Sequence, residues 1–213
     1  MIMNNLCKNI LVLAPHTDDG ELGAGGTISK FIENGNIVYY IAFSTADKSV
    51  PEGMPTDILK TEVKAATAKL GIKANHLFVL DFEVRKLNYV RQEILEQLIR
   101  IKKEIKFDLV FMPSLHDIHQ DHTTIANEGL RAFKDTSILG YELIWNNLTF
   151  NTTSFVKLKE DNIRKKIEAL KEYKSQNGRD YISEEFILSL ARTRGVQIGC
   201  QFAEAFEVIR WIL

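Results

Sequence analysis

One stretch of the chain decides its fold: Leu11-Val-Leu-Ala-Pro-His-Thr-Asp-Asp-Gly-Glu-Leu-Gly-Ala-Gly-Gly-Thr27. The apolar run from Ile10 to Ala14 stops at Pro15, and a short apolar run that ends at a breaker indicates a buried strand. At the carboxyl end of that strand, where open α/β sheets bind ligands, come His16, Asp18, Asp19 and Glu21. Three carboxylates beside an imidazole are costly to bury unless positive charge lies among them, so we expect a divalent metal ion there.

A second stretch repeats this pattern downstream: Phe107-Asp-Leu-Val-Phe-Met-Pro-Ser-Leu-His-Asp-Ile-His-Gln-Asp-His122. The apolar run from Leu109 to Met112 again stops at a proline, and the acids and imidazoles that follow are His116, Asp117, His119, Asp121 and His122. Four of the chain's five histidines fall in the two clusters. We therefore predict that both clusters contribute to one metal site. Two unrelated solvated loops are the alternative.

The rest of the chain alternates strands with helices. Strands are predicted at 10–14, 37–43, 76–80, 109–112 and 138–144, and helices at 21–33, 56–70, 89–106 and from 122 or 123 to about 133. Such alternation predicts a parallel, doubly wound sheet. The tail breaks the rhythm, with strands at 154–158 and 203–209 and helices at 162–173 and 184–191; we expect the last strand on the sheet or at its edge. Since no linker or repeat is visible, residues 1–213 are predicted to form a single domain.

Composition limits the possible partners and compartment. The chain has 213 residues, 45% hydrophobic and 26% charged, and its net charge of -1 gives no indication of a nucleic-acid or membrane-surface partner. The first apolar run is short and follows Lys8 and Asn9, unlike a signal-peptide core, and no run approaches the roughly 18 apolar residues of a membrane span. We expect a cytoplasmic protein in which Cys7 and Cys200 stay reduced rather than paired.

The two motifs resemble those of a known family. The first is similar to the His-Pro-Asp-Asp-Glu motif and Gly-rich turn of the PIG-L/LmbE-like zinc-dependent N-deacetylases, and the second to their His-Pro-Asp-His motif. Tyr173-Lys-Ser-Gln176 and the segment 191–206 resemble the C-terminal part of that family. The resemblance implies a Rossmann-like α/β fold with helices on both faces of a mostly parallel sheet. It also implies hydrolysis of the N-acetyl amide of a GlcNAc-type amino-sugar conjugate, and a homo-oligomer.

Roles for individual residues follow from the resemblance. His16, Asp19 and His122 match the metal ligands, and such a donor set suits one Zn²⁺ per chain, although Fe²⁺ or Co²⁺ also fits. Asp18 matches the general base, unless it instead caps the following helix. His119 matches the residue that stabilises the oxyanion, as a cation, and Asp121 is a plausible partner that keeps it charged and oriented.

Other positions are weaker candidates. Arg192 and Arg194 in the tail could hold a phosphate or a sugar hydroxyl, and Asp47, Lys48 and Arg85 follow strand ends. We expect His116 and Asp117 to belong to a solvated loop. Gly23-Ala-Gly-Gly26 lacks the spacing of a nucleotide-binding loop, so close packing of a helix explains its glycines better.

The chain departs from the family pattern at three positions. Gly20 stands where the family usually has Glu, and Thr17 and Gln120 stand where the motifs have proline. No predicted ligand or base is lost, so the departures bear on substrate specificity more than on metal binding. Two other functions remain open: a metal-dependent phosphoesterase, which would need more ligands for a second ion, and a sugar-binding module without catalysis.

Overall fold

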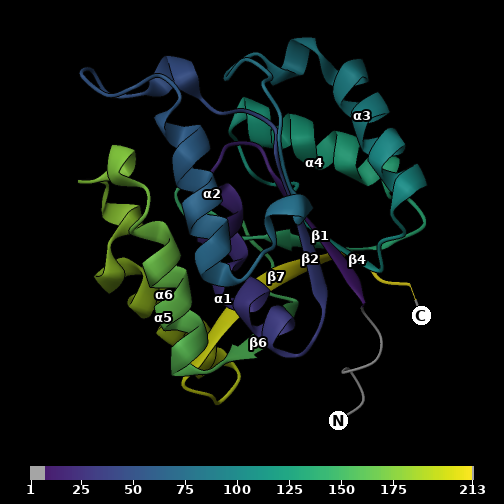
Figure 1. Ribbon diagram of the computed structural model, residues 1–213. Helices are drawn as coiled ribbons and strands as arrows, with labels where there is room; N and C mark the ends of the chain where they lie inside the picture. The colour runs from purple at the N-terminus through teal and green to yellow at the C-terminus, as the bar shows by residue number, and fades with distance from the viewer. Residues whose placement is uncertain (1–7, 213) are drawn as a thin grey trace.

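The computed structural model describes residues 8–212, and its core is a sheet of seven strands in the order β3-β2-β1-β4-β5-β7-β6 (Figure 1). The strands are β1 (Asn9–Ala14), β2 (Ile37–Ala42), β3 (Leu77–Val79), β4 (Leu109–Pro113), β5 (Ser137–Tyr141), β6 (Ser154–Leu158) and β7 (Phe202–Arg210). β1 to β5 pair in parallel, whereas β7 runs antiparallel to both β5 and β6. The predicted mostly parallel α/β sheet is confirmed.

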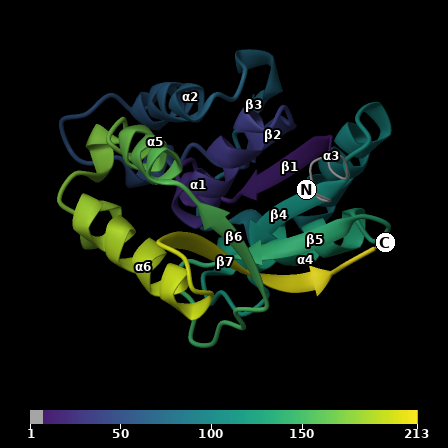
Figure 2. The same cartoon turned by 90° about the horizontal axis from the view of Figure 1, so that it is seen from below.

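Helices cover both faces of the sheet (Figure 2). One face carries α1 (Asp19–Glu33), α2 (Ile58–Leu70), α5 (Glu160–Leu170) and α6 (Glu184–Gln197), and the other carries α3 (Arg91–Glu104) and α4 (Gln120–Ala132). The buried apolar side chains accordingly form two clusters, one between each helix layer and the sheet.

The position of β1 in the sheet explains why its sequence is almost wholly apolar. Successive side chains of a strand point to opposite faces, so Ile10, Val12 and Ala14 join the cluster under α1, while Leu11 and Leu13 join the cluster under α3 and α4. A strand covered on both faces has no solvent side, so alternation with polar residues is absent. The strand ends at Ala14, and the metal-site residues follow within the next five positions.

The glycines of α1 let this helix approach the sheet closely. A Cβ at Gly23 would overlap the Tyr141 ring, and one at Gly26 would lie 2.6 Å from Leu158 Cδ1. Contacts that short exclude any side chain. The packing explanation for the Gly-rich turn is therefore confirmed. This close packing also determines how near α1 lies to the sheet.

Several element bounds differ from the expectation, α6 for example running to Gln197 rather than to 191, whereas the last strand does lie on the sheet. α1 begins at Asp19 and α4 at Gln120, each about a turn or less earlier than predicted, because polar residues that seemed to belong to loops form the first helical turns. β7 lies between β5 and β6, and β6 is the strand at the end of the sheet's order. In residues 8–212 no helix has the length and apolar character needed to cross a bilayer. Cys7 lies outside the described residues, and Cys200 is half-buried with a free thiol.

Candidate metal centre

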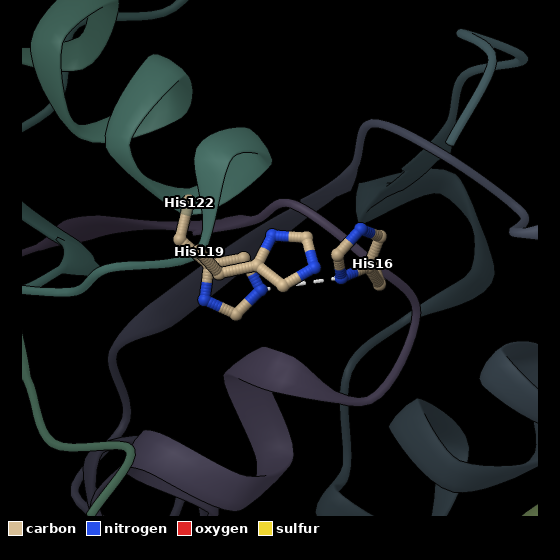
Figure 3. Close-up of side chains that lie close together, drawn as sticks. All are labelled: His16, His119 and His122. Atoms are coloured by element: carbon tan, nitrogen blue, oxygen red, sulfur yellow. Dashed lines mark hydrogen bonds between the residues drawn. The ribbon is translucent and has the colours of Figure 1, made fainter. Parts of the chain in front are cut away.

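The loop after β1, together with the loop after β4 and the first turn of α4, brings three imidazoles together at the carboxyl edge of the sheet (Figure 3). One ring nitrogen each of His16, His119 and His122 lies within 4.8 Å of the other two. β1 and β4 are neighbours in the sheet, so His16 and His122, which are 106 positions apart in sequence, meet where the two strands end. The two sequence clusters therefore form one group of side chains, as predicted.

Asp19 forms a tighter triangle with two of these histidines. His16 Nδ1 lies 3.2 Å from Asp19 Oδ2 and 3.2 Å from His122 Nε2, and His122 Nε2 lies 3.3 Å from Asp19 Oδ2. Tetrahedral ligands at about 2.0–2.1 Å from zinc are about 3.3–3.4 Å from one another. The triangle therefore has the size of one face of a zinc coordination tetrahedron, and it is more compact than the group of three imidazoles.

Carboxylates behind both histidines fix which ring nitrogen carries the proton. His16 Nε2 is 2.9 Å from Asp121 Oδ2, and His122 Nδ1 is 2.8 Å from Asp117 Oδ2. A carboxylate accepts hydrogen bonds, so each of these nitrogens is the N–H donor. In the neutral rings, the nitrogens with free lone pairs, His16 Nδ1 and His122 Nε2, then face each other and Asp19. Three acceptors so close together fit a cation at their centre.

The same arrangement governs the acid–base properties of these groups. Burial lowers the pKa of His16, but hydrogen bonds to Asp121 and Asp19 outweigh burial and raise it to about 9. Burial likewise opposes the charge on His122, and Asp19 and Asp117 raise its pKa to about 10. The pKa of Asp19 falls well below its usual range in spite of burial, because His122 and His16 stabilise its charge. The group thus favours positive charge, and a divalent ion would compete with protons for it.

Asp18 lies at the N-cap position of α1, but its side chain makes no capping hydrogen bond. It lines the cleft beside His16 and Asp19 instead. Burial, followed by the charge of Asp19, raises the pKa of Asp18 to about 6. A carboxylate that gains proton affinity while facing a cleft can accept a proton near neutral pH. Its capping alternative therefore receives no support from the geometry.

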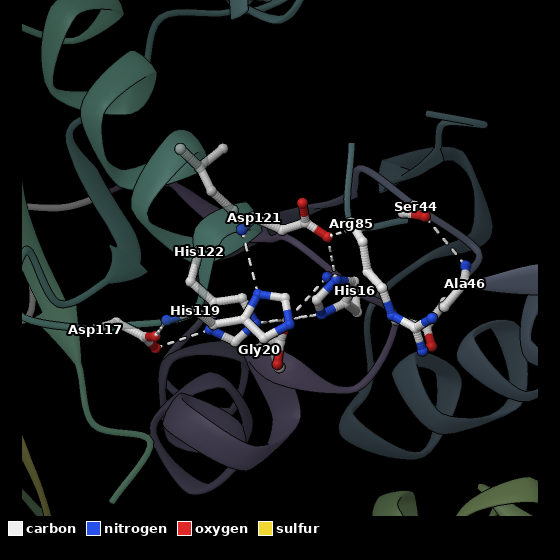
Figure 4. Close-up of polar contacts among 12 residues, drawn as sticks. His16, Gly20, Ser44, Ala46, Arg85, Asp117, His119, Asp121 and His122 are labelled. Atoms are coloured by element: carbon white, nitrogen blue, oxygen red, sulfur yellow. Dashed lines mark hydrogen bonds and ion pairs between the residues drawn. The ribbon is translucent and has the colours of Figure 1, made fainter. Parts of the chain in front are cut away.

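Asp121 does not hold the side chain of His119, contrary to our expectation. Its carboxylate contacts His16 Nε2 and accepts hydrogen bonds from the backbone N–H groups of Arg85 at 2.6 Å and Leu87 at 3.3 Å (Figure 4). The Asp121 backbone N–H, 3.2 Å away, donates to His119 Nδ1, so His119 is the N-cap of α4. In the neutral ring the proton is then on Nε2. Burial, His122 and His16 lower the pKa of His119, which favours that neutral form over the cation we expected.

The solvated-loop prediction is wrong for Asp117. This residue is buried, and its two carboxylate oxygens accept hydrogen bonds from His122 Nδ1–H and from the His119 backbone N–H, both at 2.8 Å. The side chain of His116 is 51% exposed and lies 3.9 Å from Glu207, so for His116 the loop prediction fits. Sequence spacing alone gave no sign that Asp117 and Asp121 support different histidines.

Glu21 faces the interior rather than the cleft. The hydroxyls of Tyr40 and Tyr173 hydrogen-bond its carboxyl group, and burial raises its pKa to about 8. The Tyr40 ring also occupies the space beside Gly20, where a Cβ would lie 2.5–2.7 Å from three of its atoms. At position 20, where the family usually has Glu, this chain has Gly20, and the Tyr40 side chain lies against it. Both hydroxyls also lie within hydrogen-bond distance of the Thr17 carbonyl, Tyr40 at 2.9 Å and Tyr173 at 2.7 Å, so each tyrosine shares its one proton between Glu21 and the loop of the site.

A cleft of about 330 Å³ opens over the group. Its lining includes Asp18, Asp19, Leu22, Ser49, Arg85, His119, Trp145, Asn146, Gln176, Arg179 and Tyr181. Arg192 and Arg194 do not line it. Arg194 pairs with Glu142, and Arg192 donates to the Gln201 carbonyl at 3.2 Å. Their position gives no support to the expectation that they bind substrate.

Several residues of the cleft were not found by sequence reasoning. Trp145 and Tyr181 stack with ring centroids 4.2 Å apart, and Gln176 and Arg179 stand beside them. These residues follow β5 and α5 in the chain, in segments that contain no metal-binding motif. Only the Tyr173–Gln176 stretch, through its resemblance to the family tail, could have indicated this segment.

Comparisons of the sequence with known proteins find a matching family and relatives. Residues 11–133, more than half of the chain, match the family PIG-L: GlcNAc-PI de-N-acetylase. The chain is 24% identical to the diacetylchitobiose deacetylase of Thermococcus kodakarensis, over 96% of this chain and 84% of that protein.

Solved structures show the same fold. N,N'-diacetylchitobiose deacetylase from Pyrococcus horikoshii superposes with a TM-score of 0.80 at 22% identity, covering 98% of this chain and 87% of that one. The zinc inhibited form of a teicoplanin deacetylase superposes with a TM-score of 0.77 at 16% identity, covering 93% and 97%. The matched segment contains both motifs of the metal group. This chain therefore belongs to the PIG-L family of de-N-acetylases.

Proposed function

We propose that this protein is a metal-dependent N-deacetylase that hydrolyses the N-acetyl amide of an amino-sugar conjugate, releasing acetate and the free amine. The observation that carries the proposal is the triangle of His16 Nδ1, Asp19 Oδ2 and His122 Nε2, with edges of 3.2–3.3 Å, beside the Asp18 carboxylate in the cleft. Family membership makes a deacetylase the expected class of enzyme.

His16, Asp19 and His122 would hold one divalent ion per chain. Two imidazoles and one carboxylate suit Zn²⁺, and Fe²⁺ or Co²⁺ can take the same donors. When bound, the ion would polarise the acetyl carbonyl and make a water molecule more acidic. Asp117 and Asp121 would keep the two ligand rings in the tautomers that leave the inner nitrogens free.

Asp18 would act as the general base. Its carboxylate faces the cleft without a capping hydrogen bond, and burial raises its pKa to about 6. A base with a pKa close to the working pH is largely ionised and still binds a proton well. Asp18 would therefore take a proton from the attacking water as the C–O bond to the acetyl carbon forms.

His119 would stabilise the charge that develops on the carbonyl oxygen. The Asp121 backbone N–H donates to its Nδ1, so the neutral ring offers Nε2–H as a hydrogen-bond donor. A donor already held in place stabilises the tetrahedral oxyanion without reorganisation during the reaction. When the C–N bond breaks, the departing amine would receive the proton that the Asp18 carboxyl took from the water.

The walls of the cleft support an amino-sugar substrate. The stacked rings of Trp145 and Tyr181 offer an apolar surface, and Asn146 and Gln176 offer polar groups nearby. Ligand pockets commonly combine an aromatic surface with a few polar groups that orient the ligand. A curated relative is named for its action on diacetylchitobiose, which is a sugar of this class.

The phosphoesterase alternative is less well supported. A second ion would need further free ligands within reach. Glu21 is bound by two tyrosines, Asp117 by His122 and the His119 backbone, and the His116 side chain is 51% exposed beside Glu207. Each of the spare candidates from the sequence therefore has another partner or another location.

The test is release of free amine from a panel of N-acetylglucosamine conjugates. Chelator-treated protein should be inactive, and one equivalent of zinc should restore amine and acetate in equal amounts. Excess zinc is to be avoided, since a structural relative was solved in a zinc inhibited form. Binding of N-acetyl sugars without acetate release would favour the sugar-binding module. Phosphate release with two ions per chain would favour the phosphoesterase, and either outcome would exclude the deacetylase.

A further inference from the structure

A buried ion pair lies against the middle of α1, outside the metal group. Lys166 of α5 and Glu204 of β7 approach to 2.7 Å, and each side chain is 7% exposed. Among the ion pairs that lysine and arginine form within residues 8–212, no other has both side chains so deeply buried. Replacing such a pair by apolar side chains of similar size often leaves stability unchanged or higher, so stability alone does not explain the pair.

The two side chains bind backbone groups inside a helix. The two Glu204 oxygens accept hydrogen bonds from the backbone N–H groups of Gly26 at 3.1 Å and Thr27 at 2.7 Å. Lys166 Nζ donates to the Leu22 carbonyl at 2.6 Å. In a regular α-helix the N–H at position 26 donates to the carbonyl at position 22. The ion pair therefore binds both groups of one hydrogen-bonding step of α1, which lies beside α5 (Figure 2).

The sequence of α1 explains why these turns need support. Four of the first eight residues of the helix are glycines: Gly20, Gly23, Gly25 and Gly26. Glycine is the poorest helix former except for proline, because it loses the most backbone freedom on folding. Lys166 itself depends on one of these glycines, since a Cβ at Gly25 would lie 2.8 Å from Lys166 Cγ. The first turns of α1 are thus weak on their own and are held by side chains from other elements.

The same turns carry a proposed metal ligand and the proposed base. Asp19 is the first residue of α1, and Asp18 precedes it at the N-cap position. The Leu22 backbone N–H donates to the Asp18 carbonyl at 3.0 Å. Leu22 is therefore bound on one side to Lys166 and on the other to the backbone of Asp18. A shift of the helix at this point would move both carboxylates of the site.

Building on the proposed metal-dependent deacetylase, we propose that Lys166 and Glu204 are positioning residues of the metal centre. By holding the Gly-rich turns of α1, they keep Asp19 in the triangle of ligands and Asp18 beside it. Neither residue lines the cleft over the metal group. Both lie beyond the residues 11–133 that match the family, so side chains from the C-terminal part of the chain support a site whose ligands all come from the matched part.

Glu204→Gln is the first test. Glutamine can accept through one oxygen only, so one of the two N–H groups of α1 loses its acceptor. In protein kept well below its Tm, we expect zinc affinity and kcat each to fall by about tenfold, with KM unchanged. Zinc affinity is measured by competition with a chromophoric chelator, and kcat with the conjugate that the wild-type protein turns over fastest.

Arg194→Gln is the matched control. It breaks a second buried ion pair, and the hydrogen bonds of the Arg194 side chain go to Glu142 and Gln197 rather than to α1. This variant should lower Tm while zinc affinity and kcat stay at their wild-type values. If Glu204→Gln behaves in the same way, with a lower Tm alone, the ion pair is only structural and the positioning proposal is overturned.

Gly25→Ala keeps the experiment decisive if Glu204→Gln does not fold. It retains both charges, but its Cβ displaces the Lys166 side chain, so we expect the same losses of about tenfold. Wild-type zinc affinity and kcat in Gly25→Ala would then refute the proposal. A wild-type protein that binds zinc without releasing amine would refute the deacetylase alone, because zinc affinity still tests the positioning role. A wild-type protein that binds no zinc would overturn both proposals.

Discussion

Replacing Asp117 by asparagine tests how the candidate metal centre is supported. The two oxygens of the Asp117 carboxylate accept from His122 Nδ1–H and from the His119 backbone N–H, each at 2.8 Å. Asparagine has one oxygen and one NH₂ group, so it can accept only one of these hydrogen bonds. The other N–H then faces a donor. If that N–H is on His122, the ring can switch tautomer, and Nε2 loses the lone pair it needs to bind a metal.

The expected changes in zinc affinity and in stability follow from the loss of one hydrogen bond and of the fixed tautomer of His122. Removing a group that orients a metal-bound histidine costs about 10–100-fold in metal affinity, which is about 1.4–2.7 kcal/mol. A buried donor without an acceptor costs about 1–3 kcal/mol of stability. For a chain of this size that corresponds to a fall of roughly 2–12 °C in Tm for the metal-free protein.

The measurements are zinc affinity by competition with a chromophoric chelator and Tm by calorimetry. Asp135→Asn serves as the control, because Asp135 is 66% exposed and pairs with Lys102 on the surface. Zinc affinity and Tm that are the same in Asp117→Asn and in the wild type would refute the reasoning, since both depend on the two hydrogen bonds.

Three further predictions concern other residues. Asp18→Asn should keep zinc but lower amine release by about 10²–10⁴-fold, because it removes the proposed base; unchanged turnover would remove Asp18 from the mechanism. Gly20→Ala should lower stability by about 1–3 kcal/mol in a denaturant titration, because its Cβ would lie 2.5–2.7 Å from the Tyr40 ring; an unaltered midpoint would contradict the packing. Arg194→Gln should lower the free energy of unfolding by about 1.5–3 kcal/mol through loss of its pair with Glu142, seen as a lower Tm, and leave KM unchanged; a higher KM would return Arg194 to the binding site.

The local sequence pattern predicted the individual strands and helices of the parallel part of the sheet. Apolar runs stopped by Pro15 and Pro113 marked β1 and β4, and the His and Asp residues after them meet because the two strands are neighbours. The position of β7 between β5 and β6 could not be predicted from local pattern. The pattern of apolar residues in a strand is the same whether that strand has one neighbouring strand or two.

The candidate site was predicted unevenly for a similar reason. Residue type and spacing indicated His16, Asp19 and His122, but the partners of their outer ring nitrogens depend on how the loop 114–119 turns. Asp117 and Asp121 were therefore given the wrong surroundings. The residues that line the cleft were the least predictable: Arg85 was only a weak candidate from a loop after a strand, and no local motif accompanies Arg179.

The position of β7 has a consequence for biosynthesis. This strand is the last of the sheet to leave the ribosome, yet it fills a place between β5 and β6. Until it emerges, β5 presents a row of unpaired backbone groups and β6 has no partner, which makes the nascent chain prone to pair with other strands. Translation stalled before Phe202 would thus produce a chain that contains every residue of the metal group but leaves the facing edges of β5 and β6 unpaired.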